Sequence, residues 1–299
     1  MAGYHRGEFA VQERAGLRGP AARAEPAIRR TIPPAAATFL AEQPMIVLGS
    51  RDAAGRVWAG LRTGVPGFAR ATGESTVAID ALPVPGDPLA EAPVGPTPVG
   101  LLAIAPATRR RMRVNGTAYA TATGLRVEAQ QVYANCPKYI QRRVPTATAS
   151  APGPARRGTA LTPAQRDLIA RTDTFFVATA DEAGAADVSH RGGNPGFLRL
   201  TSPGTLRWPD YVGNAMFMTL GNLAVHPGAG VLVPDWSSGT TLQLTGTARV
   251  IWDAAEVGEV PGAQRLVEFE LAEAVEIPGG SPLRWSAPEY SRHNPSFSA

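Results

Sequence analysis

The alternation of apolar and polar residues predicts a protein built mainly from short β-strands. Apolar runs rich in Val, Ile, Leu and Phe end in glycine, proline and polar residues, a pattern typical of strands joined by tight turns. In the first half of the chain, we expect strands at residues 45–49, 57–63, 76–80, 99–104, 111–122 and 125–133. In the second half, we expect them at residues 175–179, 186–189, 205–208, 230–234, 240–251 and 274–277.

Helices are fewer in this pattern. Proline is tolerated in a first helical turn, so Ile32-Pro-Pro opens one helix, and Thr162 is a good N-cap for another. We expect helices, in chain order, at residues 9–17, 32–41, 162–171, 216–224 and 263–273. The last of these is an acidic segment without an equivalent in the first half.

The same order of segments occurs twice. Gly55 and Gly184 each lie in a turn after an apolar run, and Pro-Gly-Phe-x-Arg begins at Pro66 and again at Pro195. Both pairs are 129 positions apart, and later landmarks such as Gly-Thr-Ala recur at an offset of 130. A period of this length excludes a solenoid. It indicates two like domains that pack as a pseudo-dimer within one chain.

The connections between strands are too short for parallel crossovers, which favours antiparallel strands that close into a small barrel in each half. The predicted fold class is therefore mainly β with a few helices. The predicted domains are an N-terminal arm at 1–30, a first repeat at 31–145, a linker rich in Ala, Pro, Ser and Gly at 146–160, and a second repeat at 161–299.

Composition narrows the possible partners. The 299-residue chain has 18% charged residues, 32 glycines and 28 prolines, and its net charge of +4 comes almost wholly from arginine because Lys138 is the only lysine. Arginine suits planar anions such as phosphate. Nucleic-acid binding needs a basic face interleaved with aromatic residues, and the arginines here are dispersed apart from the 109–113 run, so we expect no nucleic-acid partner.

Disulfide-bonded, metal-binding, membrane-spanning and secreted proteins are also disfavoured classes. Cys136 is the only cysteine, and the four histidines lie far apart, so we expect neither disulfides nor a metal site. No apolar run approaches the roughly 20 residues of a membrane helix, and the first residues lack the apolar core of a signal peptide. We therefore expect a cytoplasmic protein without a membrane partner. The sequence also lacks a P-loop, a Gly-x-Ser-x-Gly elbow and a dinucleotide-binding glycine motif.

Polar residues that recur at equivalent positions are the first candidates for a binding site. Arg62 and Arg191 correspond, and each stands beside glycine, where backbone N–H groups and a guanidinium can bind a phosphate together. A solvated arginine at a strand end is the alternative explanation. Ser189 shares a strand face with Arg191 and His190 points the other way, while Gln243 corresponds to Arg113.

Two further clusters belong to only one half. The second half has Asp210, Gly213, Asn214 and Asn222, which ordinary turn chemistry explains equally well. The first half ends in Asn135-Cys-Pro-Lys-Tyr-Ile-Gln-Arg-Arg. Because the halves pack together, this tail can reach the second half.

These motifs resemble the pyridoxamine 5′-phosphate oxidase-like proteins, and most closely their bacterial tandem-repeat branch. The resemblance rests on Ser-His-Arg-Gly-Gly-Asn-Pro-Gly-Phe, on Trp-Pro-Asp-Tyr-x-Gly-Asn with a later Asn-Leu, on Leu-Gln-Leu-Thr-Gly, on the tail of the first half, and on the opening Tyr-His-Arg-Gly-Glu. It implies a six-stranded split barrel in each half, with FMN bound where the two barrels meet.

The resemblance also implies the site residues. Carried over, the flavin-binding set comprises Ser189, His190, Arg191, Asp210, Gly213, Asn214, Asn222, Gln243, Asn135, Lys138, Tyr139 and Gln141. If the reaction needs a proton donor, His190 and Tyr211 are the candidates. The second half departs from the family pattern because it has no lysine and has Gln243 where arginine is usual, which puts pyridoxamine phosphate oxidation itself in doubt.

The sequence thus predicts an FMN-dependent oxidoreductase that acts on a small organic substrate. No side chain need act as an acid or base in such an enzyme, because the flavin supplies the redox chemistry. The alternatives are a non-catalytic protein that carries flavin, haem or a deazaflavin, and a degenerate barrel that carries nothing. A homodimer of the whole chain is compatible with each of these possibilities.

Overall fold

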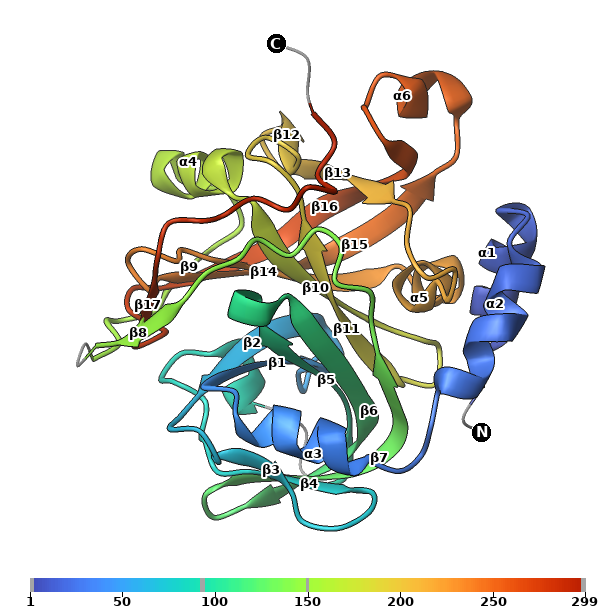
Figure 1. Cartoon of the computed structure of the whole chain (residues 1–299). Helices are drawn as coiled ribbons and strands as arrows, with labels where there is room; N and C mark the ends of the chain where they lie inside the picture. Colours follow the sequence, from blue (N-terminus) through green and yellow to red (C-terminus); the bar gives the residue numbers. More distant parts are fainter. Residues whose placement is uncertain (1–2, 92–94, 149–150, 297–299) are drawn as a thin grey trace.

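The computed structural model describes residues 3–91, 95–148 and 151–296, and it shows two β-barrels of one design stacked against each other (Figure 1). The first sheet comprises β1 (Met45–Arg51), β2 (Val57–Thr63), β3 (Ala69–Ala71), β4 (Thr76–Ile79), β5 (Thr97–Ala105), β6 (Arg110–Thr121) and β7 (Gly124–Ala134). The second comprises β10 (Thr174–Ala180), β11 (Ala186–Gly192), β12 (Arg199–Ser202), β13 (Thr205–Tyr211), β14 (Gly228–Pro234), β15 (Thr241–Ile251) and β16 (Ala263–Ile277), with β9 (Arg156–Gly158) paired to β16.

The two sheets have the same topology. The strand order is β2-β1-β5-β6-β7-β4-β3 in the first and β11-β10-β14-β15-β16-β13-β12 in the second, and the pairs between neighbouring strands are antiparallel. Each strand of the first half therefore has a counterpart at the same place in the second. The predicted duplication and the mainly β fold of tandem antiparallel split barrels are confirmed, with one more strand on each path than the six expected.

Helices and short strands complete the chain. The α-helices are α1 (Arg6–Arg14), α2 (Arg18–Ala24), α3 (Pro34–Ala41), α4 (Pro163–Arg171), α5 (Met218–Val225) and α6 (Ala254–Gly258). The 3₁₀ turns are η1 (Glu25–Ala27), η2 (Pro88–Glu91) and η3 (Pro106–Thr108), and a separate two-stranded sheet joins β8 (Pro145–Ala147) to β17 (Leu283–Trp285). Thus β8 and β9 lie in or beside the segment expected as linker.

The helix expected at 263–273 is wrong, because this segment belongs to the long strand β16. β16 fills the gap between β13 and β15 and pairs with both. Its acidic residue Glu268 accepts hydrogen bonds from Arg207 and Arg249 on those neighbours. Pairing between distant strands overrides the local pattern here. The helices expected at 32–41, 162–171 and 216–224 are present as α3, α4 and α5, and the one expected at 9–17 begins earlier, as α1.

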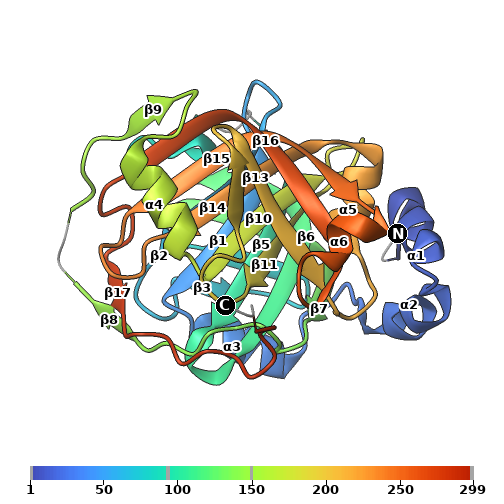
Figure 2. The same ribbon diagram turned by 90° about the horizontal axis from the view of Figure 1, so that it is seen from above.

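The two barrels meet backbone to backbone at two equivalent glycines. A Cβ on Gly100 of β5 would lie 2.8 Å from the Cα of Asp187 on β11, and a Cβ on Gly230 of β14 would lie 2.6 Å from the Cα of Trp58 on β2. The contact is therefore reciprocal, as in a two-fold dimer. Seen from above, β10 and β14 of the second barrel lie over β1 and β5 of the first (Figure 2).

A hydrophobic core fills this seam in addition to the core inside each barrel. Val47, Ala59 and Leu102 of the first barrel pack there with Phe176 and Leu232 of the second, and all five are fully buried. This part of the seam is consequently as inaccessible to solvent as a domain interior.

The N-terminal arm is held against the second barrel. Helix α1 crosses α5 so closely that a Cβ on Gly7 would lie 2.1 Å from the carbonyl oxygen of Gly221. His5 Nε2 lies 2.9 Å from Asn222 Oδ1, and Gln12 donates to the carbonyl of Met216. Figure 1 shows the resulting pair α1 and α2 beside α5.

We predict that Gly230→Ala destabilises the protein, by about 1–3 kcal/mol as is usual for overpacked sites, because the new methyl group would press on the backbone of Trp58. Gly204→Ala is the matched control, since a Cβ there meets no atom within 4 Å. Equal urea midpoints for the two variants would show that the seam tolerates the extra volume.

Candidate functional site

A pocket of about 530 Å³ opens along the seam and is lined by both barrels and the arm. β6 and the tail of the first half supply one wall, and β11, β13 and the start of α5 supply the other. Leu17 and Pro20 of the arm complete it. Pockets of this size accommodate cofactors and other small molecules.

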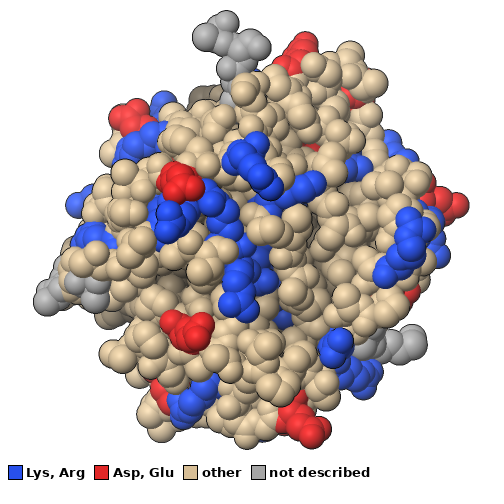
Figure 3. Space-filling model, viewed as in Figure 1, with Lys and Arg blue, Asp and Glu red and all other residues tan. Residues whose placement is uncertain are grey.

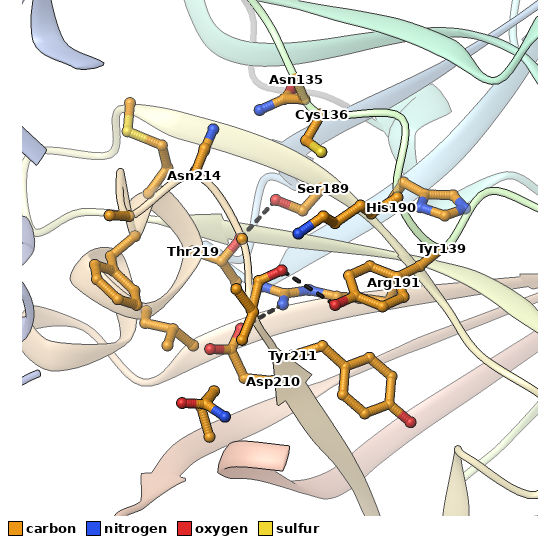
Figure 4. Close-up of a pocket in the computed structure, with 18 of the residues that line it drawn as sticks. Asn135, Cys136, Tyr139, Ser189, His190, Arg191, Asp210, Tyr211, Asn214 and Thr219 are labelled. Carbon is orange, nitrogen blue, oxygen red and sulfur yellow. Dashed lines mark hydrogen bonds and ion pairs between the residues drawn. The ribbon is translucent and has the colours of Figure 1, made fainter. Parts of the chain in front are cut away.

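On strand β11, Ser189 and Arg191 share one face and His190 lies on the other, as strand alternation predicts. Ser189 Oγ lies 2.6 Å from the hydroxyl of Thr219 on α5, and Arg191 donates to Asp210 Oδ1 on β13 at 2.7 Å (Figure 4). His190 faces the first barrel, where Arg111 Nη1 lies 2.7 Å from its Nδ1.

The carboxylate of Asp187 ties the barrels together beneath the pocket. Tyr133 donates to it at 2.8 Å, Arg113 at 3.0 Å and Asn115 at 3.2 Å, all three from the first barrel. Ser189 donates to the same carboxylate from β11. Asp187 is only 3% exposed, so these four donors replace its water shell and fix Ser189 at the pocket floor.

The described side chains that line the pocket carry more positive than negative charge. Five are cationic, namely Arg111, Arg113, Lys138, Arg191 and Arg265, and one, Asp210, is acidic. Asp210 serves both Arg191 and Arg265, and Asp187 behind the wall serves Arg113. In the described part of the chain, no carboxylate pairs with Arg111. Lys and Arg side chains also gather near the middle of the face in Figure 3.

The uncompensated charge perturbs the groups around it. Burial, with the nearby guanidinium groups of Arg113 and Arg191, lowers the pKa of Arg111 to about 9. Burial and the positive charge of Arg111 hold the pKa of His190 well below its usual value, so this imidazole is neutral at neutral pH. An anion bound in the pocket would compensate this positive charge.

Several buried polar atoms here have no partner among the described residues. They include the Nε atoms of Arg111, Arg113 and Arg191, together with Asn135 Oδ1. Native proteins rarely leave such groups unsatisfied. These residues lie around one pocket, so a polar ligand fits the donor set.

The backbone at the start of α5, beside the pocket, has an unusual conformation. Ala215 and Phe217 have positive φ angles of 61° and 60°, and Asn214 Oδ1 accepts from the backbone N–H of Met216. Such conformations are unfavourable for residues other than glycine and cluster at functional sites. The first backbone N–H groups of a helix favour negative charge, and Thr219 lies in this turn.

An aromatic pair from the two halves stands at one side of the pocket. The rings of Tyr139 and Tyr211 lie 5.0 Å apart at 33°, and Tyr139 OH donates to the carbonyl of Val212. Gly192 has to be glycine, because a Cβ would lie 2.0 Å from the carbonyl oxygen of Tyr139. The first-half tail is thereby pressed onto β11.

Residues 161–282 match the family model described as pyridoxamine 5′-phosphate oxidase. The second barrel is a member of the pyridoxamine 5′-phosphate oxidase-like split-barrel family. The resemblance seen in the sequence is thereby confirmed, and the first barrel repeats the strand order of this oxidase-like barrel. No curated protein matches the chain.

Solved structures resemble single barrels of the chain. HupZ of Group A Streptococcus is 17% identical with a TM-score of 0.31, and the match covers 37% of this chain and 89% of that one. The FAD binding protein of Mycobacterium smegmatis is 13% identical with a TM-score of 0.30, covering 40% and 98%. A Clostridium acetobutylicum protein related to general stress protein 26 is 14% identical with a TM-score of 0.27, covering 35% and 79%.

Most of the expected site residues lie together in the seam pocket. The pocket is lined by Asn135, Lys138, Tyr139, Ser189, His190, Arg191, Asp210, Gly213 and Asn214, and also by Tyr211. The remaining three do not line it. Gln141 donates to the backbone of Gly193, Asn222 donates to Thr179, and Gln243 donates to the carbonyl of Ala59 at the opposite side of the seam.

Sequence reasoning missed several pocket residues. Arg111 and Arg113 are two positions apart on one strand, so strand alternation alone places both on the same face, and this signal was available. No comparable sequence pattern indicates that Thr219 and Arg265 line the pocket. Leu17 reaches the pocket only through the path of the arm, which no local pattern reveals.

The described residues contain no group of three or more His, Cys, Asp or Glu side chains arranged to hold a metal ion. They also contain no helix long and apolar enough to cross a membrane.

We predict that Glu8→Gln raises stability at alkaline pH. Glu8 lies on α1 of the arm and is buried against α5, and burial raises its pKa from 4.5 to about 8. The folded protein therefore favours the protonated carboxyl, and stability falls as pH rises from about 4.5 to about 8. Tm profiles of the two proteins should diverge over this range. Glu13→Gln, an exposed change on the same helix, should leave the profile unaltered, and an unchanged profile for Glu8→Gln would contradict the burial argument.

Proposed function

We propose that the seam pocket binds FMN and that the chain is an FMN-dependent oxidoreductase acting on a small organic substrate. The observation that carries this proposal is the surplus of positive charge at the pocket, centred on Arg111. A phosphate group brings a charge of about −1.5 to −2. It would give a counter-charge to Arg111 and would accept from guanidinium N–H groups that lack partners.

The phosphate end belongs near the start of α5. Ser189 and Thr219 offer hydroxyl groups there, and Arg113 extends from β6 to Asp187, to which Ser189 is also bonded. Arg111 lies two positions before Arg113 on β6, and it forms no ion pair with a carboxylate in the described structure. Hydroxyl, guanidinium and helix N–H donors together form a typical phosphate-binding set.

The ring end of the ligand would use the apolar part of the wall. Leu17, Pro20 and Phe217 line the pocket together with Tyr139 and Tyr211. Such surfaces exclude water from a planar heterocycle while the polar groups fix its orientation. FMN is the proposed cofactor because its terminal phosphate monoester, with a charge of about −1.5 to −2, matches the charge surplus.

The bound flavin would supply the redox chemistry, and the chain would position it and set its surroundings. Arg111 always donates, so Nδ1 of the neutral His190 accepts and the ring proton lies on Nε2. His190 can therefore donate a hydrogen bond but is a poor proton source. Burial raises the pKa of Tyr211 to about 12, so it also remains protonated.

FMN titration tests the proposal directly. We expect Arg111→Ala to weaken FMN binding about 10–100-fold, the usual worth of a hydrogen bond to a charged group. Riboflavin, which lacks the phosphate, should bind the variant and the parent chain almost equally. Arg70→Ala removes an exposed arginine of the first barrel as a matched control. We expect Arg191→Ala to have a smaller effect, because Asp210 already compensates Arg191.

The outcomes separate the alternatives. An equal loss of FMN and riboflavin affinity in Arg111→Ala would mean that the phosphate lies elsewhere. Uptake of haem in place of FMN would indicate a haem carrier, and a chain that takes up neither would be an empty scaffold.

Catalysis needs its own measurement. We expect chain-bound reduced FMN to be reoxidised by at least one member of a panel of small organic acceptors faster than free reduced FMN under anaerobic conditions. Equal rates across the panel would leave a flavin-carrying protein without catalytic function.

A further inference from the structure

The first barrel has a counterpart of the pocket, and we infer that this counterpart is a second anion site closed by an internal carboxylate, that of Asp87. One chain consequently binds one phosphorylated ligand rather than two. This inference rests on the proposed function for the identity of the ligand but not for the closure itself.

Strand topology fixes the equivalent positions. Arg191 is paired with Phe175 on β10, and Arg62, 129 positions earlier, is paired with Ile46 at the same place on β1. Likewise, Gln243 on β15 occupies the place that Arg113 has on β6. The three positions of the open pocket Ser189, Arg111 and Arg113 thus become Gly60, Thr241 and Gln243 in the counterpart.

Asp87 supplies an internal anion to Arg62 in the counterpart. Its Oδ2 accepts from Arg62 Nη1 at 2.7 Å, and the two side chains are 2% and 3% exposed. Oδ1 accepts from the backbone N–H of Leu89 at 2.9 Å and lies 3.3 Å from Gln243 Nε2. The carboxylate is therefore surrounded by donors from both barrels, as a bound anion would be.

Gly60 allows this closure. A Cβ there would lie 3.1 Å from Leu89 Cδ1 and 3.2 Å from Asp87 Oδ2, so a larger side chain would push the segment outward. In the open pocket the corresponding residue is Ser189, which instead meets Thr219 on α5. The short turn η2 contacts β2 in the place where α5 contacts β11.

The charges agree with a closed site. The open pocket has three arginines from β6 and β11, of which Arg111 pairs with no described carboxylate. At the three equivalent positions of the counterpart only Arg62 is an arginine, and it pairs with Asp87. A tethered carboxylate is always present at high effective concentration. No surplus of positive charge therefore remains in the counterpart to bind a free anion.

Ligand stoichiometry tests the inference on the unaltered chain. We expect titration of a known protein concentration with FMN to saturate at one per chain, and Arg111→Ala to weaken that single event. Two equivalents of tight binding would overturn the inference. A chain that binds no FMN would refute the proposed function instead. The response of an Asp87 variant to inorganic phosphate, described next, would then test the closed site.

Removal of the internal carboxylate should reopen the site. Asp87→Asn leaves Arg62 without a counter-charge, so inorganic phosphate should raise the Tm of this variant more than that of the parent chain at matched ionic strength. The double variant Arg62→Ala, Asp87→Asn should lose the additional rise. Equal phosphate responses of Asp87→Asn and the parent would contradict the inference, and if Asp87→Asn does not fold, the stoichiometry decides.

Discussion

The direct contact of the two barrel backbones at Gly100 and Gly230 sets the geometry of the molecule. Because a side chain at either glycine would collide with the facing strand, the barrels approach far more closely than two surfaces covered with side chains. This approach brings β6 of the first barrel within reach of β11. The pocket, and the network that joins Arg113 and Tyr133 to Asp187, exist only at this spacing.

Electrostatics then distinguishes the pocket from the rest of the seam. Beneath the floor, Asp187 balances Arg113, and on the wall Asp210 balances Arg191 and Arg265. Among the arginines of the pocket, Arg111 alone lacks such compensation within the described residues, and its charge adds to burial in keeping His190 neutral. Charge that is costly in the absence of a ligand favours binding of an anion, in the same way that many binding sites sacrifice stability for function.

The duplication was predictable because turns leave local signals, and glycine and proline repeat at a constant offset. Strand β16 was not predictable, since its acidic side chains are stabilised by arginines of β13 and β15, which are distant in sequence. The same holds for the site. Residues adjacent to glycine-rich motifs on β11 and β13, expected from the sequence, line the pocket, whereas Gln243, also expected there, faces the opposite side of the seam. Arg111 was missed because its significance depends on the approach of two distant strands.

The pocket walls come from three parts of the chain that are far apart in sequence, namely the arm, the end of the first barrel and the second barrel. A ligand that contacts all three parts would hold them together. Detachment of the arm or separation of the barrels would forfeit its binding energy, so occupancy should suppress local opening motions that leave each barrel intact. The loaded protein would then unfold in a single transition even if its halves separate stepwise when empty.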